Sequence, residues 1–121
     1  MRAETVPTTA EAVATYDATI NIFEGMFRDL KELSKKKPDA TMSAFKVGQI
    51  NRILGDIRAF VKDEPEAKYL DLLDDEQLPQ IGDAVIVMAQ YEGALKGFRE
   101  RHYGWDGMNQ RWFVEEKKSH R

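Results

Sequence analysis

Residues 8–37, TTAEAVATYDATINIFEGMFRDLKELSKKK, decide the fold. Apolar side chains recur in this stretch at spacings of three and four residues, which is the a/d pattern of a helical heptad. The seam comprises Val13, Tyr16, Ile20, Phe23, Phe27 and Leu30. Ile22, Met26 and Leu33 flank it and are expected to widen the core-facing side of the helix. Such a helix is not stable alone in water, so the rest of the chain is expected to supply helices that cover it.

Both ends of this helix are marked in the sequence. Thr8 with Glu11 three residues later fits a capping box, so the helix is expected to begin at Thr8. The lysines of residues 35–37 complement the negative end of the helix dipole, and Pro38 prevents continuation. The predicted first helix therefore spans residues 8–36.

Two further segments repeat the same spacing and predict long helices over residues 42–62 and 78–103. Short helices are expected near 65–74 and 107–117, the second because Trp105, Met108 and Trp112 again fall three and four apart. Gly48 and Gly55, seven apart, suggest a close approach between helices, with chance as the rival explanation.

The predicted fold class is all-α, a small antiparallel up-down helical bundle with three long helices carrying heptad seams plus two short helices. The expected organisation is a flexible lead-in over 1–7, one helical-bundle domain over 8–117 and a flexible tail over 118–121.

Composition limits the class of protein. At 121 residues, with 42% hydrophobic residues, the chain is long enough for one packed domain. It contains no cysteine and no apolar run near the roughly 18 residues of a membrane span. We therefore expect a cytoplasmic protein that does not bind membranes.

Charge is unevenly distributed. The net charge is +1 over residues 1–59, −7 over 60–92 and +3 over 93–121. An acidic middle and a basic C-terminal part would attract different partners or attract each other between subunits, whereas the simplest interpretation is solubility alone.

The most suggestive residues gather near the C-terminal end of the last long helix and beyond it. The candidate partner-binding residues are Lys96, Arg99, Arg101, His102, Tyr103, Trp105, Arg111 and Trp112. Arginine with tryptophan and tyrosine is the composition of interface hot spots, and also of surfaces that hold phosphate and stack bases. The structural alternative is that the tryptophans close one end of the bundle, while His102 continues the seam as a packed histidine.

The sequence contains no catalytic or cofactor motif, so we expect no enzyme, no cofactor and no dedicated metal site. One alternative is a divalent-ion site formed by acidic residues, against the simpler interpretation of a solvated linker. Its candidates are Asp71, Asp74, Asp75, Glu76 and Asp83.

The function predicted from these observations is a non-enzymatic helical interaction module, an adaptor or accessory subunit that acts through protein contacts. Because three long heptad helices carry more apolar surface than one subunit buries, a homodimer is expected, with the predicted tail helix as the other candidate for a fourth partner. The alternative function is a nucleic-acid-binding accessory protein that uses the basic and aromatic C-terminal region, together with the lysines of residues 35–37.

Overall fold

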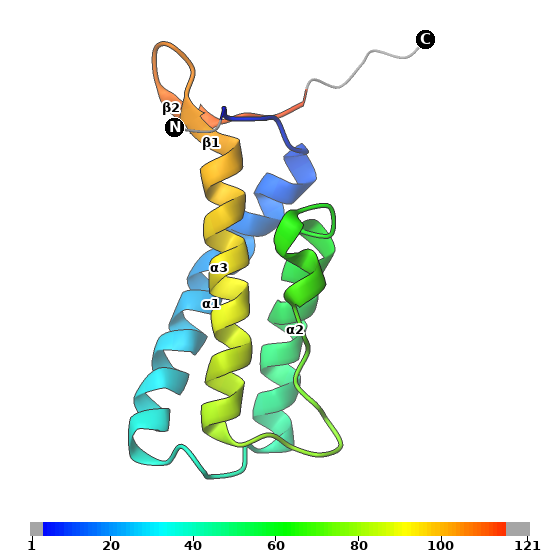
Figure 1. Cartoon of the computed structure of the whole chain (residues 1–121), viewed down its shortest axis with the longest axis vertical. Coiled ribbons are helices and arrows are strands. Elements are labelled where there is room, and N and C mark those ends of the chain that lie inside the picture. Colours follow the sequence, from blue (N-terminus) through cyan, green and yellow to red (C-terminus); the bar gives the residue numbers. More distant parts are fainter. Residues whose placement is uncertain (1–3, 116–121) are drawn as a thin grey trace.

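A computed structural model describes residues 4–115 and is mostly helical, as the sequence predicted. Its α-helices are α1 (Ala10–Lys36), α2 (Ala44–Phe60) and α3 (Ile81–His102), and a short 3₁₀ helix, η1, spans Pro65–Tyr69. Strands β1 (Tyr103–Trp105) and β2 (Gln110–Trp112) form an antiparallel hairpin after α3. The three helices pack side by side, and the hairpin stands at one end of the bundle (Figure 1). Within residues 4–115, no helix has the length and apolarity needed to cross a membrane.

The direction of the helices differs from the predicted up-down order. α1 runs opposite to α2 and α3, whereas α2 and α3 run the same way (Figure 1). The starts of these two helices are held together, since the Met42 N–H donates to Pro79 O at 2.9 Å and the Ile81 N–H donates to Ala40 O at 2.9 Å. The sequence prediction missed this because residues 70–80, half assigned to a short helix, are non-helical. Eleven extended residues reach about 35 Å, enough to return the chain along the bundle.

The first helix begins at Ala10, two residues later than predicted, because its N-cap is one residue further along the chain. The hydroxyl of Thr9, not of Thr8, accepts the Ala12 N–H at 3.1 Å, and Thr9 is the N-cap. Thr8 instead joins a backbone bridge with Val114. The other end is as expected: α1 ends at Lys36, directly before the C-cap Lys37 and Pro38.

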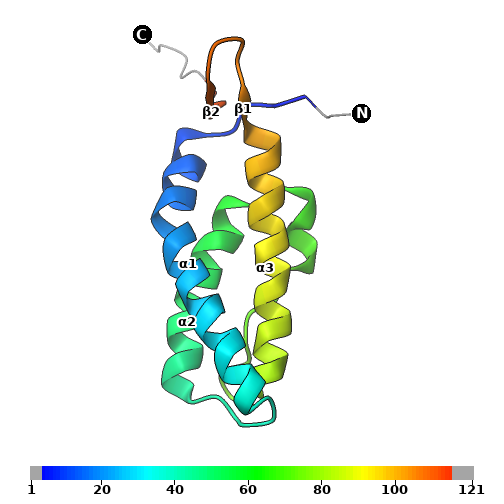
Figure 2. The ribbon, with the colours of Figure 1, turned by 90° about the vertical axis from the view of Figure 1, so that its left-hand side faces the viewer.

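The α1 seam forms the centre of the core. Tyr16, Phe23, Phe27 and Leu30 are buried, and they pack with a larger set of buried apolar residues from α2 and α3. That set includes Val47, Leu54, Ile57, Met88, Tyr91, Leu95 and Phe98. The predicted widening of the core is wrong at Ile22, which is 50% exposed. In Figure 2, α1 crosses in front of α2, and α3 lies to one side of both.

The second helix spans 44–60 rather than 42–62, with Ser43 as its N-cap. The predicted close approach at Gly48 and Gly55 is not present, because a Cβ at either position would meet nothing within 4 Å.

The predicted short helix over 65–74 is only the five-residue η1, followed by extended chain. This chain is fixed at two points. The Asn51 amide exchanges hydrogen bonds with both backbone groups of Leu73, each at 2.9 Å, and the Tyr91 hydroxyl donates to Asp71 O at 2.7 Å. These bonds satisfy a backbone that has no neighbouring strand.

The predicted tail helix over 107–117 is wrong for the described residues up to 115, where a hairpin replaces it. The Asp106 carboxylate accepts the N–H groups of Met108 and Asn109, both at 2.8 Å, and so closes the hairpin turn. Gly107 has φ +103°, which a β-turn accommodates and an α-helix does not. The last long helix accordingly spans 81–102 instead of 78–103.

The N-terminal segment completes this end of the bundle. Val6 lies in the expected lead-in, and its N–H donates to Arg101 O at 2.8 Å. Thr8 donates to Phe113 O at 2.9 Å and accepts from the Glu115 N–H at 2.8 Å. Residues far apart in the sequence thus hold one another across the bundle end. The expected flexible tail, 118–121, lies outside the described residues.

Candidate interaction surface at the hairpin end

The eight residues singled out from the sequence all lie on the last turns of α3 or on the hairpin, but they occupy three different environments. Arg101 and His102 face inward, toward η1 and the N-terminal segment. Tyr103 and Trp112 are half-buried, and Lys96, Arg99, Trp105 and Arg111 are exposed. The structure therefore separates residues that the sequence placed together.

Arg101 and His102 form an ionic cluster with two glutamates of the η1 region. Arg101 Nε donates to Glu64 Oε1 at 2.8 Å, and its terminal nitrogens donate to the carboxylate of Glu66. His102 is buried, with Nε2 3.1 and 3.2 Å from the two Glu64 oxygens and Nδ1 2.7 Å from the carbonyl oxygen of Val6. Because a carbonyl and a carboxylate are both acceptors, this arrangement needs a proton on each ring nitrogen or one on Glu64.

The electrostatics of the cluster follow from these contacts. Burial acts to raise the pKa of Glu66, but the hydrogen bonds and charge of Arg101 outweigh it, so the pKa lies below its usual value. Burial acts to lower the pKa of Arg101, and the two carboxylates reverse that effect. Gly97 permits the approach, since a Cβ there would collide with the Glu66 carboxylate. These charges are satisfied within the protein, and their evident role is to join α3 to η1.

Trp112 belongs to an aromatic cluster that closes the bundle end. Its ring centroid lies 5.0 Å from that of Tyr16, 5.7 Å from Phe98 and 5.3 Å from Tyr103. Tyr103 and Trp112 are cross-strand partners in the hairpin, and the guanidinium of Arg99 lies 4.3 Å from the centre of the Tyr103 ring. The position of Trp112 therefore fits the structural alternative, in which a tryptophan closes one end of the bundle.

The hairpin turn presents the opposite environment. Trp105, the last residue of β1, is 60% exposed, and Met108, in the turn that Asp106 fixes, is 79% exposed. The Arg111 Nε lies 3.0 Å from Asp106 Oδ2. The backbone N–H groups of Asn109 and Met108 hold the pKa of Asp106 below its usual value, with Arg111 adding to the effect. Two large apolar side chains are thus displayed in water by an ordered loop.

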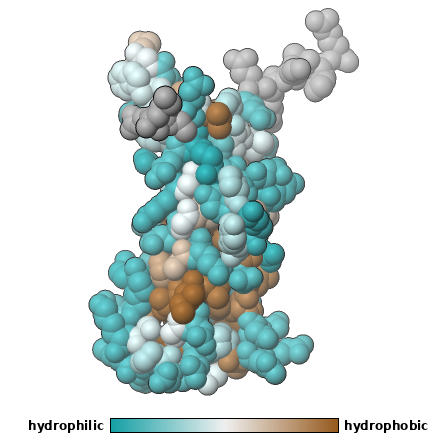
Figure 3. All heavy atoms as spheres, viewed as in Figure 1, coloured by the Kyte–Doolittle hydropathy of each residue, from teal (hydrophilic) through white to brown (hydrophobic). Residues whose placement is uncertain are grey.

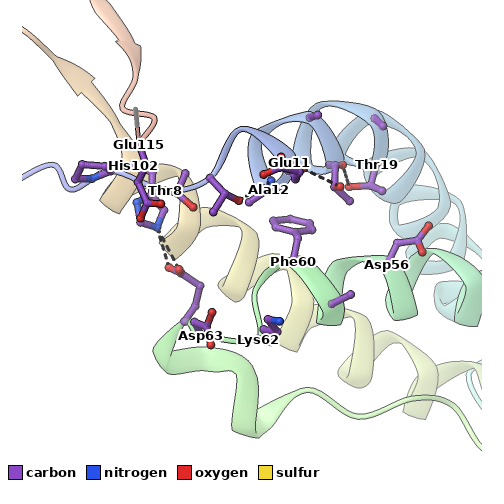
Figure 4. A pocket seen from close by; sticks show the side chains of 17 residues that line it. Thr8, Glu11, Ala12, Thr19, Asp56, Phe60, Lys62, Asp63, His102 and Glu115 are labelled. Atoms are coloured by element: carbon purple, nitrogen blue, oxygen red, sulfur yellow. Dashed lines mark hydrogen bonds and ion pairs between the residues drawn. The ribbon is translucent and has the colours of Figure 1, made fainter. Parts of the chain in front are cut away.

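A cavity of about 890 Å³ lies beside this end, between the N-terminal half of α1 and the end of α2. His102 and Glu64 close one end of it, and Phe60 lies in its wall (Figure 4). Its rim is acidic, with Glu11, Asp56, Asp63, Glu64 and Glu115 against Lys62. The hydroxyls of Thr15 and Thr19 donate to backbone carbonyls of α1, so their protons are already used within the helix.

The structure describes no metal centre. Among residues 4–115, no group of three or more His, Asp or Glu side chains is placed to hold an ion. Asp74, one of the acidic residues considered from the sequence, accepts the N–H groups of Glu76 and Gln77 at 2.8 and 2.9 Å, and these bonds lower its pKa. Asp71 instead contacts Gln90, with an Oδ2–Nε2 distance of 3.4 Å.

Sequence reasoning missed Glu64 and Glu66 as partners of Arg101, and it missed Met108 as an exposed residue. The opposite charges of 63–66 and 99–101 were a usable signal, but no sequence pattern indicates how the two segments align with each other. Comparison of the chain with protein-family models, with curated proteins and with solved structures found no match to any of them.

Proposed function

We propose that this protein is a non-enzymatic interaction module that binds another protein through the tip of its β-hairpin. The supporting observation is the exposure of Trp105 and Met108 on a turn held by Asp106. Tryptophan is among the residues most enriched in interface hot spots, and methionine adapts to irregular apolar surfaces. A partner of this tip carries an apolar pocket that accepts one large ring.

Preorganisation supports the same proposal. A flexible loop loses conformational entropy when it binds, whereas a turn already fixed by side-chain hydrogen bonds loses less. Asp106 accepts two backbone N–H groups and pairs with Arg111, so the tip keeps its shape before a partner arrives. Arg99 and Lys96 continue along α3 below the hairpin and supply an exposed polar rim.

The test compares capture by the wild-type chain with capture by Trp105→Ala, using full-length chains as bait and quantifying every co-purified species. The expected result is loss of at least 90% of one reproducible partner, with the helical circular dichroism unchanged. A matched control is Ile86→Ala, because Ile86 is 65% exposed on the first part of α3, far from the hairpin. Figure 3, in the same view as Figure 1, shows apolar side chains on the half of the molecule away from the hairpin, where the first part of α3 lies. Equal capture by wild type and Trp105→Ala would contradict the proposal.

The nucleic-acid alternative has less support. Residues 35–37 lie at the opposite end of the bundle from the hairpin (Figure 1). Arg101 is paired with Glu64 and Glu66, Arg111 with Asp106 and Lys96 with Glu92, so phosphate contacts near the hairpin would rest mainly on Arg99. Co-purified material absorbing at 260 nm that is lost between about 50 and 200 mM salt would favour this alternative, since phosphate contacts release counterions.

A further inference from the structure

A second surface lies on the side of the bundle away from α3, in the groove between α1 and α2. One half of this groove is an apolar hollow of about 410 Å³ at the end opposite the hairpin. Its apolar lining is Met26, Leu30, Leu33, Met42 and Ile50. Phe45, 74% exposed, neighbours the lining residue Lys46, and Ile22, 50% exposed, lies one helical turn from Met26.

The groove is apolar because α1 has more apolar width than its neighbours cover. Phe23 and Phe27 face the core, whereas Ile22, Met26 and Leu33 follow one another at spacings of four and seven along the α2 side of the helix. Ile53 of α2 is half-buried and packs against the core. A tail helix was the other candidate to cover this surface, but residues 103–112 form a hairpin at the bundle end instead.

Charge along the groove has a direction. At the hairpin end the walls of the groove carry Glu11, Asp56 and Asp63. Apart from His102, the one basic residue that lines this end is Lys62. At the other end the walls carry Lys36 and Lys46. Two acidic residues also lie at that other end, but Asp29 contacts Arg28 at 3.5 Å and Glu32 contacts Lys35 at 3.1 Å. One end of the groove is therefore acidic, the other offers lysines, and apolar residues lie between.

We propose that a second copy of this chain occupies the groove, related by a two-fold axis that passes near Ile22. The axis lies in the plane of the contact, perpendicular to the groove and at its middle, so the grooves of the two copies are antiparallel. The lysines of each copy then face the acidic end of the other. α1 and α2 of one copy then form a layer that packs face to face on α1 and α2 of the other, with Ile22 of each copy at the centre of the contact. The structure thus assigns self-association to a defined face.

The size of the face is sufficient. α2, at 17 residues, is about 25 Å long, and two adjacent helices are about 20 Å wide. The projected area is about 500 Å² per copy, or about 1,000 Å² for two copies, before the corrugation of side chains is counted, which reaches the lower bound of roughly 1,000 Å² for a specific interface. This proposal does not depend on the hairpin, because the two surfaces share no residue.

The chain contains no cysteine, which permits a direct test of the axis. A single Ile22→Cys variant of the full chain has one thiol per copy, and a disulfide forms only where the two Cα atoms lie within about 7 Å. Under mild oxidation we expect at least half of Ile22→Cys to run as a covalent dimer. Ile86→Cys, at a position of α3 that is more exposed than Ile22, is expected to stay monomeric on the same gel. Equal cross-linking of both variants would overturn the proposed axis.

Sedimentation equilibrium tests the interface without a cross-link. The wild-type chain is expected at twice its sequence mass at 50 µM, and Ile22→Asp at the monomer mass with unchanged circular dichroism. Lys36→Glu with Lys46→Glu is expected to weaken the dimer at least tenfold, and adding Glu11→Lys with Asp56→Lys to restore it. A wild-type monomer at 200 µM would overturn the proposal, and a helix of a different protein would then be the remaining candidate to occupy the groove. Trp105→Ala is expected to remain dimeric, which separates failure here from failure of the hairpin proposal.

Discussion

Truncation of Trp112 is expected to destabilise the protein far more than truncation of Trp105, although the two residues lie on neighbouring strands of the same hairpin. Trp112 is half-buried and its ring lies within 6 Å of three other rings. Trp105 is 60% exposed. Trp112→Ala therefore removes a ring that closes the core, whereas Trp105→Ala removes one that mainly contacts water.

The magnitude follows from the buried area. A tryptophan side chain has about 200 Å² to bury, so half of it at about 25 cal/mol per Å² gives about 2.5 kcal/mol. Three aromatic pairs at the low end of their usual range add about 1.5 kcal/mol, and partial collapse of the site recovers some of that sum. We expect Trp112→Ala to lower the free energy of unfolding by about 3 kcal/mol and Trp105→Ala by about 1 kcal/mol or less.

Urea denaturation followed by circular dichroism at 222 nm measures both values on the same scale. For a domain of this size, the expected difference corresponds to a Tm lower by about 8 °C for Trp112→Ala than for Trp105→Ala. Equal destabilisation by the two variants would refute the assignment of Trp112 to the closed end of the bundle. A larger loss from Trp105→Ala would also refute the proposal that Trp105 is free to bind a partner.

Three further predictions concern polar contacts. Replacing Asn51 by Ala leaves both backbone groups of Leu73 without their partner, so a loss of about 2 kcal/mol of unfolding free energy is expected in urea melts. Burial acts to raise the pKa of Glu66, but the effect of Arg101 is larger, so the pKa in the folded protein lies below the ordinary value of 4.5. The ion pair therefore stabilises the fold fully above pH 4.5, and this contribution disappears as the pH falls through the lowered pKa. Glu66→Gln is therefore expected to make Tm less dependent on pH below about 4.5, and an unchanged acid profile would contradict this pairing. Asp106→Ala removes the acceptor that closes the hairpin turn, and faster amide hydrogen exchange is expected in the hairpin, with the helices unaffected.

The helices could be predicted because their signal is local. Four of the six predicted seam residues of α1, Tyr16, Phe23, Phe27 and Leu30, are buried, since one face of a surface helix must be apolar to pack. In the first half of α1 the burial falls one residue earlier than predicted, on Ala12 and Thr19 in place of Val13 and Ile20. The exposure of Ile22 could not be predicted in the same way. A heptad gives the direction of the apolar face but does not say how much of its width a neighbouring helix covers.

The C-terminal part was mispredicted for a physical reason. Trp105, Met108 and Trp112 satisfy helical spacing, yet the same residues stand in or beside two strands of three residues joined by a tight turn. A carboxylate that accepts N–H groups two and three residues ahead caps a helix and closes an Asx turn equally well, so Asp106 did not distinguish the two. Gly107 was the more specific signal for a turn.

The inward-facing part of the candidate site depended on contacts that no local pattern encodes. His102 and Glu64 are 38 residues apart, and His102 and Val6 are 96 apart. Composition identified the residue types, but only the return of the chain through residues 70–80 brings η1 beside the end of α3. The parallel arrangement of α2 and α3 is therefore what turns Arg101 and His102 inward and leaves Trp105 and Met108 as the exposed apolar residues of the hairpin.

The two proposed surfaces have a joint geometrical consequence. The hairpin of each copy lies at the acidic end of its own groove, and the proposed two-fold axis runs the grooves antiparallel. The two hairpins of a dimer then point in opposite directions and are separated by more than the length of α1, which at 27 residues is about 40 Å. Such a dimer gains no avidity on a single compact partner, because one small protein cannot reach both tips. It is instead suited to joining two partner molecules, which is the arrangement that an adaptor with one binding tip per subunit requires.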